Sequence, residues 1–213
     1  MAPNRHDIVD LAAVSLTPVA HDPFDFMVVP GFVRPVYIPA LNLDFPDIDQ
    51  PGNFPIEKLT YGPLFKELLT VLRGPALARI IEQKFAVSLE HALSNVSVRK
   101  FCEASDGNIH TDHWSKLITG LIYFNPEWSH ESGSLRLLRS ATDIEDYGQE
   151  VKPLAGTLLL FKRSAKSYHG HKRFIGERRM LQMSWHNPSI VARSSQKLGR
   201  FGTVMAKRLA RLV

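Results

Sequence analysis

Short strand-like segments that follow one another from residue 96 onward limit the possible folds more than any other feature of this sequence. Turns, not helices, separate them, for example at 105–108, 131–133 and 153–156. Short strands without helices between them are typical of a sandwich or a barrel. Segment 117–125 is apolar on both faces, which indicates a sheet covered by a second sheet on one side and helices on the other. The segments are 96–103, 117–125, 134–139, 157–162, 167–172 and 178–186.

The helices are expected before these strands. Residues 1–24 are mixed and polar and are predicted to be irregular, and residues 24–29 to form a short strand. Proline recurs through residues 30–56, which excludes a long helix there. Between residues 57 and 89, apolar side chains recur every three or four positions, and Gly74-Pro75 divides this region into two helices. We therefore predict a mostly β fold with N-terminal helices, a double-stranded β-helix (jelly-roll, cupin-like) barrel.

The net charge of +5 belongs to the end of the chain. Residues 193–213 contain six basic residues and no acidic one. Residues 1–192 are therefore predicted to form a single domain without a basic groove for nucleic acid. Apolar and basic residues in 193–213 recur at helical spacing, which predicts a basic amphipathic helix. Such a helix docks on its own domain or on a partner subunit, or lies as a peripheral element on an anionic membrane.

A reducing, cytoplasmic location is expected for this chain. The sequence has one cysteine, Cys102, so no disulfide can form within the chain. It has no run of eighteen apolar residues that could span a membrane. The first residues lack the basic and then apolar pattern of a signal peptide.

Two short stretches contain residues of a kind that binds metal. In an extended segment, His110 and Asp112 point to the same face. A second histidine follows about sixty residues later, at His169 or at His171, which share parity. Two imidazoles and one carboxylate are the ligands of non-haem Fe(II) oxygenases, which keep open positions for O2. We prefer His169, which lies nearer the start of its strand, and expect His171 deeper in the pocket; His113 is out of phase with the pair.

An arginine is expected to bind an anion beside this metal. Arg178 and Arg179 are neighbours on one strand, so only one can point inward. Arg179 shares its row with the apolar Leu181 and Met183, and is therefore predicted to be the inward one. A buried guanidinium needs an anionic partner, which is a dicarboxylate cosubstrate or, alternatively, a protein carboxylate. The hydroxyl of Tyr123 is placed to reach the same anion, although packing alone is the commoner role of a buried tyrosine.

Other polar side chains are candidates for a substrate surface, and each is equally plausible as solvated framework. The loops 140–150 and 164–167 are candidate rims of the pocket. The side chains in question are Arg99, Glu103, Trp114 and Arg136.

In the order and spacing of its candidate metal ligands, arginine and strands, the sequence resembles the Fe(II)/2-oxoglutarate-dependent oxygenases, in particular their prolyl-hydroxylase-like branch. The resemblance covers roughly residues 95–188. It implies iron held by His110, Asp112 and His169, with 2-oxoglutarate bound to the iron and its distal carboxylate at Arg179 and Tyr123. The matching pieces are His110-Thr111-Asp112, strand 121–125 with Trp128 after it, Gly133-Ser134-Leu135, Pro153 to Phe161, His169, and Arg179 with Trp185 six residues later.

The implied reaction converts 2-oxoglutarate and O2 into succinate and CO2 and hydroxylates an unactivated C–H bond of a small-molecule or biosynthetic intermediate. The resemblance also implies that Asp112 makes halogenation unlikely, because halogenating relatives lack this carboxylate; desaturation and ring closure remain alternatives. A cupin-type metal enzyme without 2-oxoglutarate is a second interpretation, and it would leave Arg179 without a cosubstrate. A non-enzymatic metal- or ligand-sensing barrel that docks through its basic tail is a third.

Overall fold

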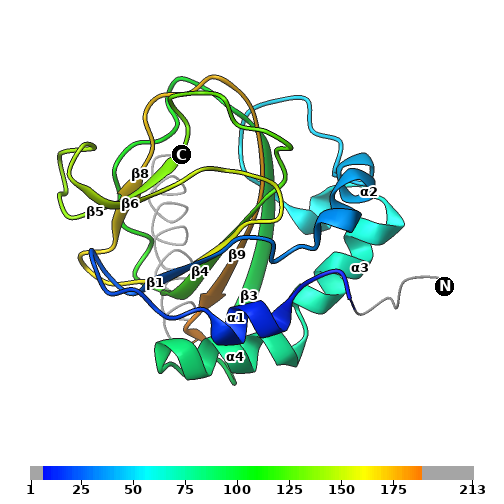
Figure 1. The fold of residues 1–213 in the computed structure, drawn as a ribbon, viewed down its shortest axis with the longest axis horizontal. Helices are drawn as coiled ribbons and strands as arrows, with labels where there is room; N and C mark the ends of the chain where they lie inside the picture. Colours follow the sequence, from blue (N-terminus) through cyan, green and yellow to red (C-terminus); the bar gives the residue numbers. More distant parts are fainter. Residues whose placement is uncertain (1–6, 189–213) are drawn as a thin grey trace, which may run out of the picture.

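The computed structural model describes residues 7–188, so the amphipathic helix predicted over 193–213 lies outside the described residues. Two antiparallel sheets face each other, and helices cover the outer face of the larger sheet (Figure 1). The larger sheet has the strand order β1-β7-β4-β9-β3-β2. Its strands are β1 Phe26–Val29, β2 Phe54–Pro55, β3 Leu93–Cys102, β4 Lys116–Tyr123, β7 Leu158–Lys162 and β9 Gly176–His186.

The smaller sheet has the strand order β6-β5-β8. An isolated bridge between His110 and His169 on β8 adds the chain after β3 to this sheet. The loop after β3 is therefore held at the open edge of β8. The strands are β5 Leu135–Leu138, β6 Tyr147–Val151 and β8 Tyr168–Gly170.

The larger sheet is buried on both faces, as its apolar sequence predicts. Side chains alternate along each strand, so β4 sends Ile118 and Ile122 to the outer face and Leu121 and Tyr123 to the inner face. The outer row joins a large apolar cluster with the helices, and the inner row joins a second cluster between the two sheets. The space between the sheets is therefore separate from the main hydrophobic core.

The two predicted helices of the region 57–89 are present and meet at Gly74-Pro75. Proline begins each of them, where its missing N–H costs no hydrogen bond. Gly62 cannot cap α3 with a side chain, and the Asp44 carboxylate accepts a hydrogen bond of 2.6 Å from the Leu64 N–H instead. The helices are α1 Leu11–Leu16, α2 Ile38–Leu43, α3 Pro63–Leu72 and α4 Pro75–Phe85, with 3-10 turns at Pro35–Tyr37 and Ile56–Lys58.

The predicted jelly-roll fold is confirmed, with two local corrections. The region 1–24 was predicted to be irregular, yet Asp10 caps α1 by accepting a hydrogen bond from the Ala13 N–H. The expected rim loop 140–150 contains most of β6, whose polar sequence hid a strand because it lies at the edge of the smaller sheet. No helix within residues 7–188 is long and apolar enough to cross a membrane.

Candidate active site

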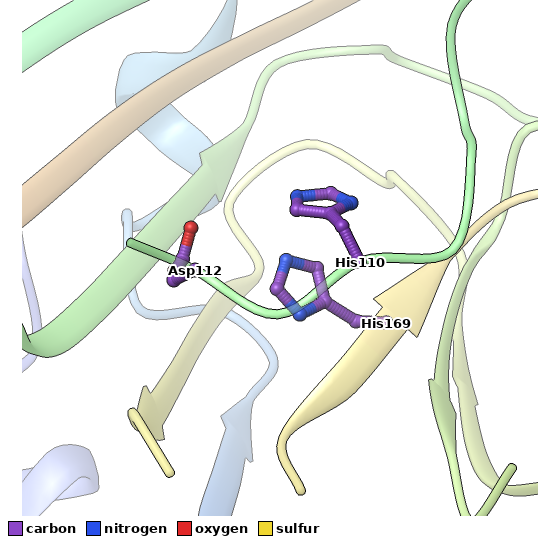
Figure 2. Close-up of side chains that lie close together, drawn as sticks. All are labelled: His110, Asp112 and His169. Carbon is purple, nitrogen blue, oxygen red and sulfur yellow. The ribbon is translucent and has the colours of Figure 1, made fainter. Parts of the chain in front are cut away.

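Three predicted metal ligands meet at one end of the space between the sheets. The ligand atoms of His110, Asp112 and His169 all lie within 4.8 Å of one another. Backbone hydrogen bonds join the two histidines, from His110 N to His169 O at 3.0 Å and back at 2.9 Å. Because directly paired residues project to the same face, the two rings lie side by side, with 4.3 Å between their centroids (Figure 2).

Two glycines let the ligand-bearing loop approach β8 closely. Gly107 has φ +92°, and a Cβ atom there would lie 2.5 Å from the His171 carbonyl oxygen. A Cβ atom on Gly170 would lie 2.7 Å from the Gly107 carbonyl oxygen. The His171 N–H donates to that same carbonyl at 3.0 Å. A side chain at either glycine would therefore push the loop that carries His110 away from His169.

Hydrogen bonds orient both imidazoles for metal binding. The Nδ1 atom of His110 donates to the Asn108 carbonyl oxygen at 2.8 Å, and that of His169 to the Ser167 carbonyl oxygen at 3.0 Å. This leaves Nε2 of each ring as the free donor atom for a metal. Burial, opposed by the Asp112 charge, lowers the pKa of His169 to about 4. The ring is thus neutral at pH 7, as a metal ligand must be.

The carboxylate of Asp112 is ionised and held on both oxygens. Burial alone would raise its pKa, but the Lys116 ammonium, the His169 ring and the Thr119 hydroxyl together hold the pKa below its usual value. Lys116 Nζ donates to Oδ1 at 2.7 Å, and Thr119 Oγ1 donates to Oδ2 at 2.5 Å. With the two imidazoles, this carboxylate gives a donor set suited to a divalent first-row metal.

The choice between the two candidate histidines follows from their positions. His169, and not His171, is brought to His110 and Asp112. The Nδ1 atom of His171 donates to the Lys172 carbonyl oxygen, and its ring lines the pocket farther from the ligand group. His113 is also outside the group and makes a hydrogen bond to the Ser115 hydroxyl at 2.8 Å.

The prediction that Arg179 points inward is wrong. Arg178 is the inward residue, with only 2% of its surface exposed, and it lines the same pocket as the three ligands. Arg179 lies on the opposite face, where it pairs with Glu177 and donates to the Asn42 side-chain oxygen at 3.0 Å. The Asn125 side chain accepts a hydrogen bond from the Arg179 N–H at 2.8 Å and fixes the backbone there.

The error has a physical cause in the two-sided burial of β9. The row of Leu181 and Met183 is apolar because it packs against the helices, not because it faces the barrel interior. Parity separates the two rows correctly but does not say which one faces the pocket. The signal in the sequence was the polarity of the other row, where Arg178 is followed by Gln182 and Ser184, since a ligand pocket needs polar groups.

Arg178 and Tyr123 have unused hydrogen-bonding capacity. Arg178 Nε donates to the Gly133 carbonyl oxygen at 2.7 Å, and its guanidinium lies 5.3 Å from the ring centroid of Tyr123. Arg178 Nη2 and the Tyr123 hydroxyl are buried and have no hydrogen-bond partner within the described part of the chain. Burial raises the pKa of Tyr123, so its hydroxyl keeps its proton and can donate. An anion between these groups would satisfy both.

A pocket of about 290 Å³ connects the ligand group with Arg178. Of the candidate substrate residues, only Arg99 lines it. Arg136 instead forms ion pairs with Glu145 and Glu150 on the smaller sheet. The pocket walls include Asn53, Arg99, Leu121, Leu135, Phe161, Met180 and Gln182.

Comparisons with known proteins identify the same region of the chain. The model of the 2OG-Fe(II) oxygenase superfamily matches residues 96–187, which contain the three predicted ligands and Arg178. No curated protein sequence matches the chain. Several solved structures share its fold at low sequence identity.

A Pseudomonas putida prolyl-4-hydroxylase aligns with a TM-score of 0.55 and 16% identity, over 88% of this chain and 97% of that one. A Trichoplax adhaerens prolyl hydroxylase, in complex with a hypoxia inducible factor oxygen degradation domain peptide fragment, aligns with a TM-score of 0.54 and 15% identity, over 86% and 90%. HygX from Streptomyces hygroscopicus, with nickel and 2-oxoglutarate bound, aligns with a TM-score of 0.53 and 14% identity, over 76% and 82%. These likenesses support the barrel fold described above.

Proposed function

We propose that this chain is a 2OG-Fe(II) oxygenase whose pocket hydroxylates an unactivated C–H bond of a small-molecule substrate, a proposal supported by the match of the superfamily model to residues 96–187. Enzymes of this superfamily use Fe(II), 2-oxoglutarate and O2. The observation that carries the proposal is the position of Arg178. Its unused donor lies in the same pocket as three residues suited to Fe(II).

Each group of the pocket has a distinct role in this proposal. His110, Asp112 and His169 bind the iron, and Arg178 with Tyr123 binds the distal carboxylate of 2-oxoglutarate through charge-assisted hydrogen bonds. When bound, iron and 2-oxoglutarate supply the oxidising chemistry that turns O2 and a C–H bond into an alcohol, with release of succinate and CO2. The protein holds the reactants in place and shields them from water.

Pocket size supports a small substrate. A volume of about 290 Å³ lies at the lower end of the range for small-ligand sites, and 2-oxoglutarate takes part of it. Two of the three solved structures described above are named as prolyl hydroxylases, so a prolyl peptide is the alternative substrate to include in any test. A cupin-type enzyme or a metal sensor would leave the Arg178 donor without a partner.

The adjacent arginines provide a matched test of the cosubstrate site. The measurement is succinate formed from 2-oxoglutarate by iron-loaded protein in air, without added substrate. We expect Arg178→Gln to raise the KM for 2-oxoglutarate by roughly 10- to 100-fold, because a charged hydrogen bond contributes about 1.5–3 kcal/mol. Arg179→Gln, which removes the same charge from the other face, should change this KM by less than about twofold.

His169→Ala should abolish both iron binding and succinate formation. Iron binding without succinate, together with a metal spectrum that 2-oxoglutarate does not change, would contradict the proposal and favour the cupin-type or sensor interpretation. A larger rise in KM in Arg179→Gln than in Arg178→Gln would show that the cosubstrate site has been placed on the wrong face of β9.

A further inference from the structure

The pocket has two chemically different walls. One wall is apolar, formed by Leu121, Leu135 and Phe161 from β4, β5 and β7. The other is polar, and includes Asn53, Arg99 and Gln182 from the side of β2, β3 and β9. 2-Oxoglutarate is a short methylene chain with charges at its ends, so the apolar wall that leads to Arg178 suits it. The polar wall remains available for a second ligand.

Strand register brings the polar side chains of this wall close together. Arg99 on β3 is paired with Met180 on β9, and Gln182 lies two residues farther along β9 on the same face. Phe54 on β2 is paired with Val98, which places Asn53 beside Arg99 on the other side. A guanidinium thus lies between two carboxamide side chains, all at the wall of one pocket.

Arg99 is fixed in place and still has a free donor. Its Nη1 atom donates to Asp106 Oδ2 at 2.5 Å, and Asp106 is itself held because it accepts a hydrogen bond of 2.9 Å from the Glu103 N–H. Arg99 Nε is buried and has no hydrogen-bond partner within the described part of the chain. A guanidinium anchored on one side and unpaired on another is prepared to bind an anion in two-pronged geometry.

We propose that Arg99, flanked by Asn53 and Gln182, binds a carboxylate group of the substrate, and that the substrate is therefore a small carboxylic acid. This inference rests on the proposed function, in which Arg178 and the metal already engage both ends of 2-oxoglutarate. Arg99 has no role in that cosubstrate site and provides the positive charge for the second ligand.

The test uses iron-loaded full-length protein and measures succinate above the rate without substrate, together with the mass gain of one oxygen atom. The probes are pools of L-amino acids and straight-chain monocarboxylic acids, and parallel pools of their primary amides. We expect acid pools to stimulate succinate formation and amide pools not to. For the acid that stimulates, Arg99→Gln should raise the KM at least tenfold, and Arg99→Lys should restore part of the loss.

Lys100→Gln is the matched control, because Lys100 follows Arg99 on β3 and lies in a surface hollow on the other face. It should leave the KM for the acid as in the wild type. Because Arg99→Gln leaves the partly buried Asp106 without its partner, the double variant Arg99→Gln/Asp106→Asn tests the same loss without an unpaired carboxylate. It should show the same rise in KM.

Three results would overturn the inference while the proposed function stands. These are stimulation by amides as strong as by acids, stimulation by a prolyl peptide but by no acid pool, or no stimulation by any probe. A KM for 2-oxoglutarate that rises as much in Arg99→Gln as in Arg178→Gln would also overturn it, because Arg99 would then belong to the cosubstrate site. If wild-type protein forms no succinate at all, the proposed function fails and the inference fails with it.

Discussion

The inner and outer faces of the larger sheet use the same residue type for different purposes. Strands β3 and β9 each contain two adjacent cations, Arg99 with Lys100 and Arg178 with Arg179, and in each pair the first lines the inner pocket and the second an outer surface hollow. The outer Arg179 is engaged by Glu177 and a neighbouring amide. The inner arginines each keep a buried donor that has no hydrogen-bond partner among residues 7–188. The inner arginines therefore differ from the outer Arg179 in how fully their donors are satisfied, and not in charge.

The faces also differ in what they bury. The outer row of β9, with Leu181 and Met183, belongs to an apolar cluster shared with the helices. The inner row alternates Met180 with Gln182, and an open pocket interrupts its packing. Stability should therefore depend mainly on the outer face, and ligand binding on the inner face.

Leu181→Ala tests this division with the largest expected loss of stability. Leu181 is fully buried, so truncation should lower the free energy of unfolding by about 2–5 kcal/mol, through lost apolar burial and the cavity left behind. Urea denaturation measures this loss. The KM for 2-oxoglutarate of the folded variant should stay within about twofold of the wild type.

Gln182→Ala on the inner face is the comparison. It should lower the free energy of unfolding by less than about 1 kcal/mol, because this side chain is only half-buried and lines a pocket. An equal loss of stability from both substitutions would refute the idea that the two faces have separate roles.

Thr119→Val should weaken metal binding at the inner face, with a smaller change in free energy than Leu181→Ala causes in stability. The substitution keeps the shape of the side chain but removes the hydroxyl that donates to Asp112 Oδ2. Partners that orient a metal ligand typically contribute 10- to 100-fold to metal affinity, so the Kd for Fe(II) should rise by about that factor. Anaerobic calorimetric titration of metal-free protein measures it.

Ser184→Ala is the control for this experiment, because Ser184 is paired with Thr119 across the strands but bonds to His186 instead of Asp112. Its Kd should change by less than about threefold. An unchanged Kd in Thr119→Val would mean that Lys116 alone orients the carboxylate.

The sequence was sufficient for the parts of this molecule that local patterns determine. Strands β4 and β9 follow from runs of apolar residues, and the two-helix region from its period and from Gly74-Pro75. The sequence reduced the second candidate histidine to His169 or His171, which share parity, and the preference for His169 came from its position nearer the start of its strand. Strand β6 was missed because its polar sequence becomes a strand only through pairing with β5.

Local sequence patterns do not predict which arginine faces the pocket. The difference between Arg178 and Arg179 is one residue on a strand whose two faces are both buried, and apolar character alone does not distinguish a core from a pocket wall. The decision depends on tertiary structure, since the helices cover the row of Arg179. In the same way, the free donor of Arg99 appears only when Asp106 is seen to occupy one side of its guanidinium.

The smallest expected effect concerns His171 on the inner face, in protein without metal. Burial, with a contribution from the neighbouring Arg178, lowers the pKa of His171 to about 4, and Asp106 and Arg99 are the other charged groups near its ring. The unfolded chain, with an ordinary histidine pKa of about 6.5, therefore takes up its proton first as the pH falls. The free energy of unfolding should thus decrease as the pH falls from about 6.5 to 4. Above pH 6.5, His171 is neutral in both the folded and the unfolded chain and no longer makes stability depend on pH.

His171→Gln removes this titrating group and leaves His169 in place. The free energy of unfolding should therefore decrease less steeply as the pH falls. The difference in the free energy of unfolding between pH 6.5 and pH 5 should shrink by on the order of 1 kcal/mol, as measured by urea denaturation at both values. His91→Gln is the control, because this exposed histidine lies outside the pocket, and the variant should keep the wild-type slope. Equal slopes in wild type and His171→Gln would show that His171 is solvated in the metal-free protein. The inner face would then be open to water near His171, and the contrast with the apolar cluster on the outer face would be stronger in solvation than in stability.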